Sequence, residues 1–546
     1  MNNKKTISII GAGATGIGLV NQIIRSLPVG LDINDIRILI FDSHKKIEGG
    51  NAYSKDIYTN LMNTKCGTID RVYGEGYGIL EWSKNNKNKW KAYMLGSDID
   101  KDSYIPRTVV GLYLADLLDF TIEKAKNIGI DIHILNDEVT DISKNSNNYK
   151  ITTKSNTYYS RYIYLALGHL DSKKNISYQY NKCYYHNPYP INKLIAQIPK
   201  EATVGIIGSR LSAIDVSLGL SAGGHTGKII SISRQGRLPA VRAEQGSYTF
   251  KDLGREKLTS LLLSRGFDLR LHEIVNMLKK EIIHAEGREL KLHDVMRKDL
   301  SPIEYYENEV YLSKGKERPW QAAIYATNGN IDLLWHYLHE EDKQALMSSW
   351  SNDWLTYRAS IPRENAEKIL SMMQSGKLSV EGNSDGFSYN EKKNKFELHR
   401  KNGKTSIEVD YLVSAAGSEN DIQKANSQLL ENLLAKGMIT PHKYGGINCC
   451  FASGRIFPSS INEKSDENCR IFAVGPLTSG VYFFTTALEV IERQVKNRAI
   501  ELSFMLASDI YKNKVKNDII LSKNTPHLEY LPNISANEVK LSGIQN

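Results

Sequence analysis

The chain has 546 residues, of which 41% are hydrophobic and 24% charged, and a formal net charge of +9. This length exceeds the size at which a single hydrophobic core keeps growing, so two or more domains are expected. The composition is that of an ordinary globular protein and excludes a disordered or fibrous chain.

The first predicted element is a strand that runs through a glycine turn into a helix. The stretch "ISIIGAGATGIGLV" has an apolar run, then Gly11, Gly13 and Gly16, then apolar residues at helical spacing. The first glycine permits a tight turn, the second lets the backbone approach a pyrophosphate, and the third lets helix and strand pack closely. A second strand, "IRILIFD", ends at Asp42, where a carboxylate can accept hydrogen bonds from an adenosine ribose. Together these features predict a dinucleotide-binding fold with the phosphates at the helix N-terminus.

Several function classes find no support in the sequence. The basic run "SKNNKNKWK" suits either a nucleic-acid surface or a solvated lysine-rich face, and the second is favoured because no RNA or DNA motif accompanies it. The five cysteines lack CxxC spacing and the histidines lack HExxH or HxxxH spacing, so no metal is expected. No apolar stretch reaches the roughly 18 residues of a membrane helix, and no signal peptide is recognisable. We expect a cytoplasmic protein with free thiols and no nucleic-acid or membrane partner.

A second glycine turn lies in "VGIIGSRLSAIDVSLGL", residues 204–220, where Arg210 replaces the middle glycine. Its side chain either contacts a phosphate or faces solvent. The following strand, "KIISISRQGR", ends in basic residues and no acid, and guanidinium groups pair well with a 2′-phosphate. NADPH is therefore expected over NADH. The predicted site consists of Gly208, Ser209, Arg210, Ser212, Ser233, Arg234 and Arg237.

Other strands are predicted to end at glycines. "YSRYIYLALGHL" ends a strand at Gly168, and "IEVDYLVSAAGSEND" ends one at Gly417, both in the form of an apolar strand that stops beside a bound cofactor. "CRIFAVGPLTSGVYFF" adds a last strand and a Gly-Pro turn, followed by an amphipathic helix through Leu488 and Ile491.

The order and spacing of nine stretches over about residues 5–500 resemble one known family. It is the family of FAD/NAD(P)-binding proteins with two dinucleotide folds, relatives of the flavin-dependent N-hydroxylating and Baeyer–Villiger type monooxygenases. The stretches are "GAGATG", "FDSHKKIEGGNAYS", "LMNT", "YIPRTVVGLYLADLL", "YLALGH", "GSRLSAID", "SRQGRLPAVR", "YRASIPRENAEKIL" with "SGKLSV", and "AVGPLTSG".

The resemblance implies a role for individual residues around FAD. The ADP half would lie on Gly11, Gly13, Gly16 and Asp42. Pro476 stands where many flavoproteins have an aspartate that bonds the ribityl chain, although the family resembled here often has proline. The other implied flavin residues are Gly50, Asn51, Ala52 and Tyr53 as the covering loop, Asn63 and Thr64 beside the ring, Arg107 as the seat of the flavin, and Gly475 and Thr478 as the turn at its pyrimidine end.

The expected fold class is α/β, with two Rossmann-like domains, of which the NAD(P)H domain is inserted in a discontinuous FAD domain. The FAD domain is predicted over 1–195 and 380–505, and the NAD(P)H domain over 196–379, with a helical insertion from about 250 to 375. Residues 506–546 form a tail of weak periodicity, partly ordered at best.

The expected function is that of an FAD-dependent monooxygenase reduced by NADPH, in which a flavin hydroperoxide passes oxygen from dioxygen to a small amine or other nucleophile. A flavin dehydrogenase or reductase, and a non-catalytic nucleotide-binding redox sensor, remain alternatives. No catalytic acid or base stands out, and oligomeric state is not indicated. His169 is either catalytic or structural, and His186 either contacts substrate or packs in a hinge. The pair Cys449 and Cys450 is interpreted as part of a strand, buried and apolar, in preference to a thiol redox centre.

Overall fold

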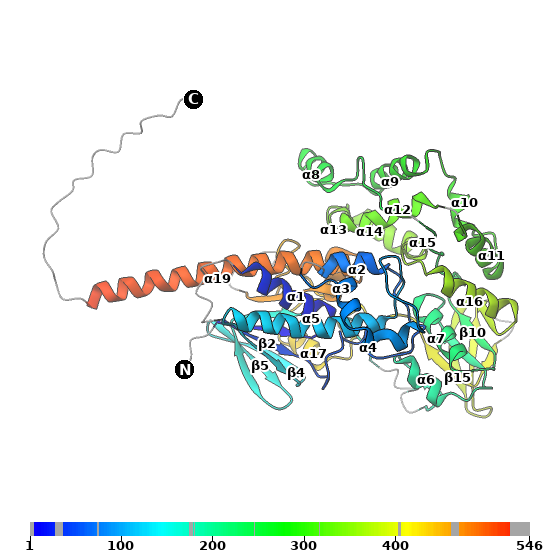
Figure 1. Cartoon of the computed structure of the whole chain (residues 1–546), viewed down its shortest axis with the longest axis horizontal. Helices are drawn as coiled ribbons and strands as arrows, with labels where there is room; N and C mark the ends of the chain where they lie inside the picture. The colour runs from blue at the N-terminus through cyan, green and yellow to red at the C-terminus, as the bar shows by residue number, and fades with distance from the viewer. Residues whose placement is uncertain are drawn as a thin grey trace.

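Two parallel five-stranded sheets organise the chain (Figure 1). The structure is a computed structural model that describes residues 5–27, 36–73, 76–173, 178, 181–244, 246–315, 317–401, 406–459 and 469–524. The apolar runs of both sheets are buried because helices or further strands cover each face. The first sheet has the order β16 (Ile471–Ala473), β7 (Tyr162–Leu165), β1 (Lys5–Ile10), β2 (Ile36–Phe41) and β3 (Asp131–Leu135).

Both faces of the first sheet are covered. One face packs against three long helices, α1 (Ala14–Ser26), α5 (Arg107–Asn127) and α19 (Leu488–Asn524). The other face packs against an antiparallel sheet of β4 (Val139–Asn145), β5 (Asn148–Thr153) and β6 (Thr157–Ser160), and against α17 (Gln428–Ala435). Short helices complete this half of the molecule: α2 (Cys66–Tyr73), α3 (Ile79–Asn85), α4 (Lys87–Trp90), η1 (Lys91–Met94), η4 (Gly475–Thr478) and α18 (Ser479–Tyr482).

The second sheet repeats this plan. It has the order β11 (Leu378–Glu381), β10 (Ile229–Ile232), β9 (Val204–Ile207), β15 (Tyr411–Ser414) and β8 (Tyr184–Tyr185). One face packs against α6 (Ile191–Gln197), α7 (Leu211–Ala222), α11 (Pro302–Ser313) and α16 (Arg363–Gln374). The other packs against the antiparallel strands β12 (Ser384–Asn390), β13 (Lys395–Arg400) and β14 (Ile407–Val409). The two parallel sheets confirm the predicted fold class.

A helical insertion separates β10 from β11, and Figure 1 shows it as a layer of helices above the second sheet. Among the helices that the structure describes, none combines the length and apolar sequence needed to cross a lipid bilayer. The helices of the insertion, apart from α11 and α16, are α8 (Arg255–Ser264), α9 (Leu271–Glu286), α10 (Leu292–Met296), α12 (Pro319–Ala326), η2 (Thr327–Gly329), α13 (Ile331–His336), α14 (Glu340–Ala345), the π-helix η3 (Leu346–Trp350) and α15 (Ser351–Arg358).

The predicted return to the first domain near residue 380 is displaced in the structure. β15, which ends shortly before Gly417, pairs with β9 in the second sheet. β15 joins the second sheet because the strands that precede it in the chain, β12 to β14, pack against that sheet and lead directly into β15. The strand that ends before Gly417 therefore lies beside the second glycine turn and not beside the first.

The C-terminal region also differs from the prediction. α19 continues through residue 505 to Asn524, and Figure 1 shows its outer end extending from the body of the molecule. Asp509 anchors it by accepting a hydrogen bond from the Tyr162 hydroxyl at 2.6 Å and pairing with Arg161 at 3.3 Å. Residues 525–546 lie outside the described residues. The sequence does not indicate this continuation, because the later turns carry many lysines and asparagines and little apolar periodicity.

Candidate functional site

The first glycine turn leaves open space at its middle position. Gly11 has φ +107°, and a Cβ there would lie 2.3 Å from the carbonyl oxygen of Ala166. A Cβ on Gly16 would lie 2.0 Å from the carbonyl oxygen of Gly11. At Gly13 the nearest atom would be 3.6 Å away, which is ordinary contact. The chain's own packing thus requires the first and third glycines, whereas the second keeps a surface free for a ligand.

A pocket of about 110 Å³ lies against this turn. Asp42 is held beside it, because its carboxylate accepts hydrogen bonds from the Ala12 N–H at 2.8 Å and the His44 N–H at 2.9 Å. Ala14, Thr15, Pro476, Thr486 and Ile491 also border the pocket, although none of them was among the predicted cofactor residues. The predicted residues that border it are Gly11, Gly13, Asp42, Gly50, Asn51, Ala52, Tyr53 and Gly168.

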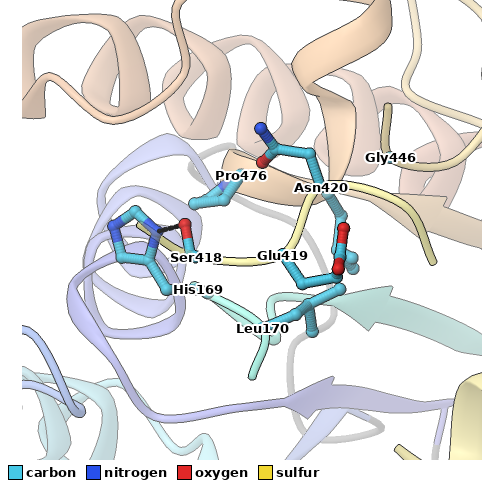
Figure 2. Close-up of a pocket in the computed structure, with 9 residues that line it drawn as sticks. His169, Leu170, Ser418, Glu419, Asn420, Gly446 and Pro476 are labelled. Carbon is cyan, nitrogen blue, oxygen red and sulfur yellow. Dashed lines mark hydrogen bonds between the residues drawn. The ribbon is translucent and has the colours of Figure 1, made fainter. Parts of the chain in front are cut away.

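A smaller pocket shares part of its border with the first and is lined by the segments that follow β7 of the first sheet and β15 of the second (Figure 2). His169, which follows β7 of the first sheet, and Ser418, which follows β15 of the second, meet at 3.0 Å between Nδ1 and Oγ. Figure 2 shows the imidazole turned toward the Ser418 hydroxyl. The His169 ring keeps access to solvent, but partial desolvation together with the charge of Arg107 lowers its pKa, so the ring is neutral at neutral pH. Gly168, His169 and Pro476 border both pockets.

Arg107, predicted to seat the flavin, joins the two halves of the molecule. Its guanidinium lies 2.8 Å from the Asp215 carboxylate of α7, and the Tyr189 hydroxyl donates to the same carboxylate at 2.6 Å. Burial alone would lower the pKa of Arg107, but Asp215 and the neighbouring tyrosines raise it overall. The side chain is therefore a permanent cation, and its charge also reaches His169 and Tyr53.

The remaining predicted flavin residues fall outside the two pockets. Asn63 and Thr64 lie between Met62, whose N–H donates to Ile105, and the start of α2. Thr478 is buried, and its hydroxyl donates to the Gly475 carbonyl at 2.8 Å. The helical turns that follow the Gly-Pro sequence, η4 and α18, have four residues each, so the expected helix dipole at this point is short.

The second glycine turn reproduces the first. Gly208 has φ +122°, and a Cβ there would lie 2.5 Å from the carbonyl oxygen of Ala415, the counterpart of Ala166. The third glycine position is taken by buried Ala213. Ser209 and Ser233 join the turn to the end of β10 through a hydrogen bond of 2.8 Å between their hydroxyls.

The Arg210 side chain does not extend into solvent, because it is hydrogen-bonded to another part of the protein. Its Nη2 donates to the carbonyl oxygen of Asn352 in α15 at 2.7 Å, so the helical insertion holds the side chain. Burial is the main cause that lowers the pKa of Arg210, and the nearby charges of Arg234 and Arg237 add to it. The three arginines thus form one cationic cluster at the end of β10.

The other residues of this predicted site are distributed around the cluster. Arg237 donates from Nη2 to the Met296 carbonyl at 2.7 Å, while Arg234 is exposed. Ser212 lies in the first turn of α7. A pocket of about 420 Å³ lies next to the arginines, and no motif predicts it. It is bordered by His293, Met296, Lys298, Ser349, Trp350 and Asp353.

A further pocket, of about 460 Å³, lies beyond the Gly-Pro turn between α13 and the 448–457 segment. Cys449 and Cys450 border it. They are not in a strand as predicted, since Cys449 makes an isolated bridge with Ile456. Cys449 is buried and Cys450 half-buried, and both are free thiols.

His186 lies elsewhere, at the end of β8, where its Nε2 contacts the Ser172 hydroxyl at 2.9 Å.

Stability is expected to depend on pH through His336, which borders this pocket and stacks on Phe451 with ring centroids 4.0 Å apart. Burial, then the charge of Lys343, lowers its pKa to about 4. The unfolded chain, with an ordinary histidine pKa near 6.5, binds more protons between these values. The free energy of unfolding should therefore fall as pH drops from about 6.5 to 4. Urea unfolding of His336→Gln should show a flatter pH profile, whereas exposed His284→Gln should keep the wild-type slope.

Comparison with known proteins agrees with this geometry. Residues 8–170 match the family model of FAD-NAD(P)-binding proteins, and residues 112–296 match that of pyridine nucleotide-disulphide oxidoreductases. No curated protein sequence matches the chain. The two matched domains describe a flavin- and NAD(P)-binding oxidoreductase, and the open position at Gly13 beside Asp42 fits the ADP half of such a cofactor.

Three solved structures share the fold over nearly the whole chain. Ornithine hydroxylase from Pseudomonas aeruginosa in its reduced form is 14% identical, with a TM-score of 0.54 over 92% of this chain and 100% of its own. L-lysine 6-monooxygenase from Pseudomonas syringae is 13% identical, with a TM-score of 0.51 over 92% and 99%. Ornithine N-hydroxylase from Kutzneria sp. 744 is 12% identical, with a TM-score of 0.51 over 94% and 100%.

Proposed function

We propose that this chain, an oxidoreductase that binds FAD and NAD(P), is a monooxygenase that takes hydride from NADPH and transfers one atom of dioxygen to a small nucleophilic substrate. Bound FAD would supply the redox chemistry, and the protein would supply binding, orientation and exclusion of water. The nucleophile expected is an amine. The three structures described above, named as two ornithine hydroxylases and a lysine monooxygenase, support this choice through the shared fold.

One observation carries the proposal: the sheets that carry the two glycine turns meet through the segments at the carboxyl ends of two of their strands. β7 pairs with β1 in the first sheet and β15 pairs with β9 in the second, and the segments after them meet at His169 and Ser418. In open parallel sheets, ligands bind at the carboxyl ends of the strands. Ligands on both turns would therefore approach the same interface, as hydride transfer between two dinucleotides requires.

The chain's own residues have defined tasks in this proposal. Gly13 and Asp42 would hold the ADP half of FAD, and Arg107 would keep the two halves of the molecule in register through Asp215. Neutral His169 would offer one ring nitrogen as a hydrogen-bond donor or acceptor at the interface, with the other engaged by Ser418. No proton transfer is assigned to it.

The proposal is tested by mixing FAD-loaded protein anaerobically with NADPH or NADH and following the loss of flavin absorbance. NADPH should bleach the flavin faster than NADH. On admission of oxygen, a long-lived absorbance distinct from oxidised flavin should appear before reoxidation. Immediate reoxidation with release of free peroxide would indicate a dehydrogenase instead, and no bleaching by either nucleotide would contradict both enzyme functions.

The choice of NADPH makes a narrower prediction at Arg234. This exposed guanidinium is the member of the cationic cluster for which the structure gives no hydrogen bond to the helical insertion. Loss of one charged hydrogen bond corresponds to about a tenfold change in affinity. Arg234→Ala should raise KM for NADPH about tenfold and KM for NADH less than twofold. Its neighbour Gln235→Ala is the control, and equal effects on both nucleotides would show that Arg234 does not bind the 2′-phosphate.

A further inference from the structure

An apolar pocket lies inside the helical insertion. It has a volume of about 110 Å³ and is bordered by residues of α9, α13 and α15, with Phe483 completing the border after α18. Leucine, isoleucine, valine and aromatic side chains form its walls together with Thr327, and no charged residue belongs to them. Val275 of α9 borders the pocket and is 54% exposed, so one edge of the pocket reaches the molecular surface.

Three side chains of this border carry a polar atom, and two of them are satisfied within the protein. The Thr327 hydroxyl donates to the Ile324 carbonyl at 2.5 Å. The Trp335 Nε1–H donates to the Gly480 carbonyl at 2.7 Å. Nε1 of Trp354 is buried and has no hydrogen-bond partner in the part of the chain that the structure describes. Buried donors are normally paired, so this indole N–H lacks the acceptor that its burial requires.

A water molecule does not fit this position. Buried waters are held by about three hydrogen bonds each, whereas the side chains of this border offer one free donor. Cavities walled by leucine, isoleucine and phenylalanine stay dry, and one of about 150 Å³ binds benzene. The pocket is therefore comparable in size to a site for one six-membered ring, and its walls favour an uncharged ring over an ion.

Two unusual backbone segments belong to the border. The π-helix η3 begins at Leu346, and such turns occur frequently at functional sites. Phe483 has φ +66°, a value that a phenylalanine adopts only where its surroundings hold it, and its ring stacks on Trp335 with centroids 4.9 Å apart. Strained residues of this kind cluster at ligand sites, so both segments favour a binding role for the pocket.

The pocket lies close to the FAD half of the molecule. Phe483 precedes Thr486, which borders the pocket at the first glycine turn, by three residues, and three residues of chain span at most about 11 Å. A ligand in contact with Phe483 would therefore touch a segment that leads directly into the cofactor pocket.

We propose that this pocket binds a small uncharged aromatic ring with one hydrogen-bond acceptor, which accepts from the Nε1–H of Trp354 while the ring packs on the apolar walls. The site is separate from the amine and nucleotide sites of the proposed function and does not rest on them. A charged molecule is excluded because no residue of the border offers a counter-charge. A plain hydrocarbon would fill the volume but leave the indole N–H unpaired.

The test compares pyridine with benzene, two rings of nearly equal size of which only pyridine has a strong acceptor. In FAD-loaded protein, in mildly alkaline buffer where pyridine is uncharged, both should raise the thermal midpoint in a saturable way. Trp354→Phe should lower the ratio of pyridine to benzene affinity about tenfold, the contribution of one hydrogen bond. Trp350→Phe is the control, because it alters an exposed indole at the end of η3 that borders the pocket beside the arginines instead, and should leave the ratio unchanged.

A spectroscopic measurement reports the donor directly. In protein with nitrogen-labelled tryptophan, the indole resonance that is missing from Trp354→Phe should move downfield with pyridine, relative to its position with benzene. If Trp354→Phe does not fold, the wild-type spectrum decides, since pyridine should still move one indole N–H resonance downfield in this comparison. The absence of such a shift contradicts the proposal, as does an unchanged affinity ratio in Trp354→Phe.

A second variant tests the place of binding. Ile274→Phe enlarges a half-buried side chain of the border and should abolish binding of both rings while FAD stays bound. Binding that survives this change would place the rings elsewhere, and a wild-type protein that binds neither ring would overturn the proposal outright. Because these measurements need neither NADPH nor oxygen, their result is independent of flavin bleaching, on which the proposed function depends.

Discussion

Gly13→Val is expected to give a folded protein that no longer retains FAD. The backbone at this position is extended, with φ −76° and ψ −174°, which any residue adopts, and a Cβ meets nothing closer than 3.6 Å. The valine side chain would instead occupy the pocket surface where the cofactor's pyrophosphate is expected. FAD affinity should fall at least about a hundredfold, or about 3 kcal/mol. Stability without the cofactor should fall by only about 1 kcal/mol, the usual cost of an apolar residue at a helix N-cap.

Two matched variants make this result interpretable. Gly246→Val places the same side chain in open space and should leave FAD content and stability unchanged. Gly16→Ala adds a single carbon 2.0 Å from the Gly11 carbonyl oxygen and should destabilise the fold itself. Bound flavin after desalting and urea unfolding of the cofactor-free protein are the measurements. Normal FAD retention in Gly13→Val would show that the pocket at the first turn does not hold the cofactor.

Asp215→Ala is expected to lower the free energy of unfolding by about 3 kcal/mol, because it leaves the half-buried Arg107 guanidinium without its counter-charge. It also removes the acceptor of the Tyr189 hydroxyl. By comparison, Glu340→Ala, which breaks an exposed pair with Lys443, should cost less than about 1 kcal/mol.

A double variant separates the loss of the pair from the cost of a stranded charge. Arg107→Met combined with Asp215→Leu removes both charges, and much of the stability should return. Denaturant titration of Arg107→Met, Asp215→Leu and the double variant gives the coupling energy between the two residues. Additive losses across the cycle would mean that the two residues act independently, against the contact of 2.8 Å.

What the sequence could and could not predict follows from how far apart the interacting residues lie. The turn at Gly11 was predictable, because strand, turn and helix are contiguous and each glycine has a local steric reason. The partner of Arg107 was not, since Asp215 lies more than a hundred residues away and nothing in either segment indicates the other. Arg210 was left with two possible roles for the same reason: its partner, Asn352, belongs to a helical insertion without motifs.

The misplaced boundary near residue 380 has a different origin. The strands that end before Gly168 and Gly417 have nearly the same pattern, an apolar run followed by Ala-Leu-Gly in one and Ala-Ala-Gly in the other. Each supplies the carbonyl oxygen that packs against the first glycine of a turn, Ala166 against Gly11 and Ala415 against Gly208. The pattern therefore predicts a strand that packs against a glycine turn, but it does not indicate which of the two sheets the strand joins, since that depends on long-range pairing.

The strand order also determines the sequence of events when the protein is made. The edge strand of the first sheet, β16, and its covering helix α19 come from the end of the chain, whereas every strand of the second sheet has been synthesised by residue 414. During synthesis on the ribosome, the second sheet can form while the first sheet still lacks its edge strand β16 and its covering helix α19. Domains usually fold in the order in which they emerge. Here the N-terminal half cannot complete its sheet and its helical layer until β16 and α19 have been made.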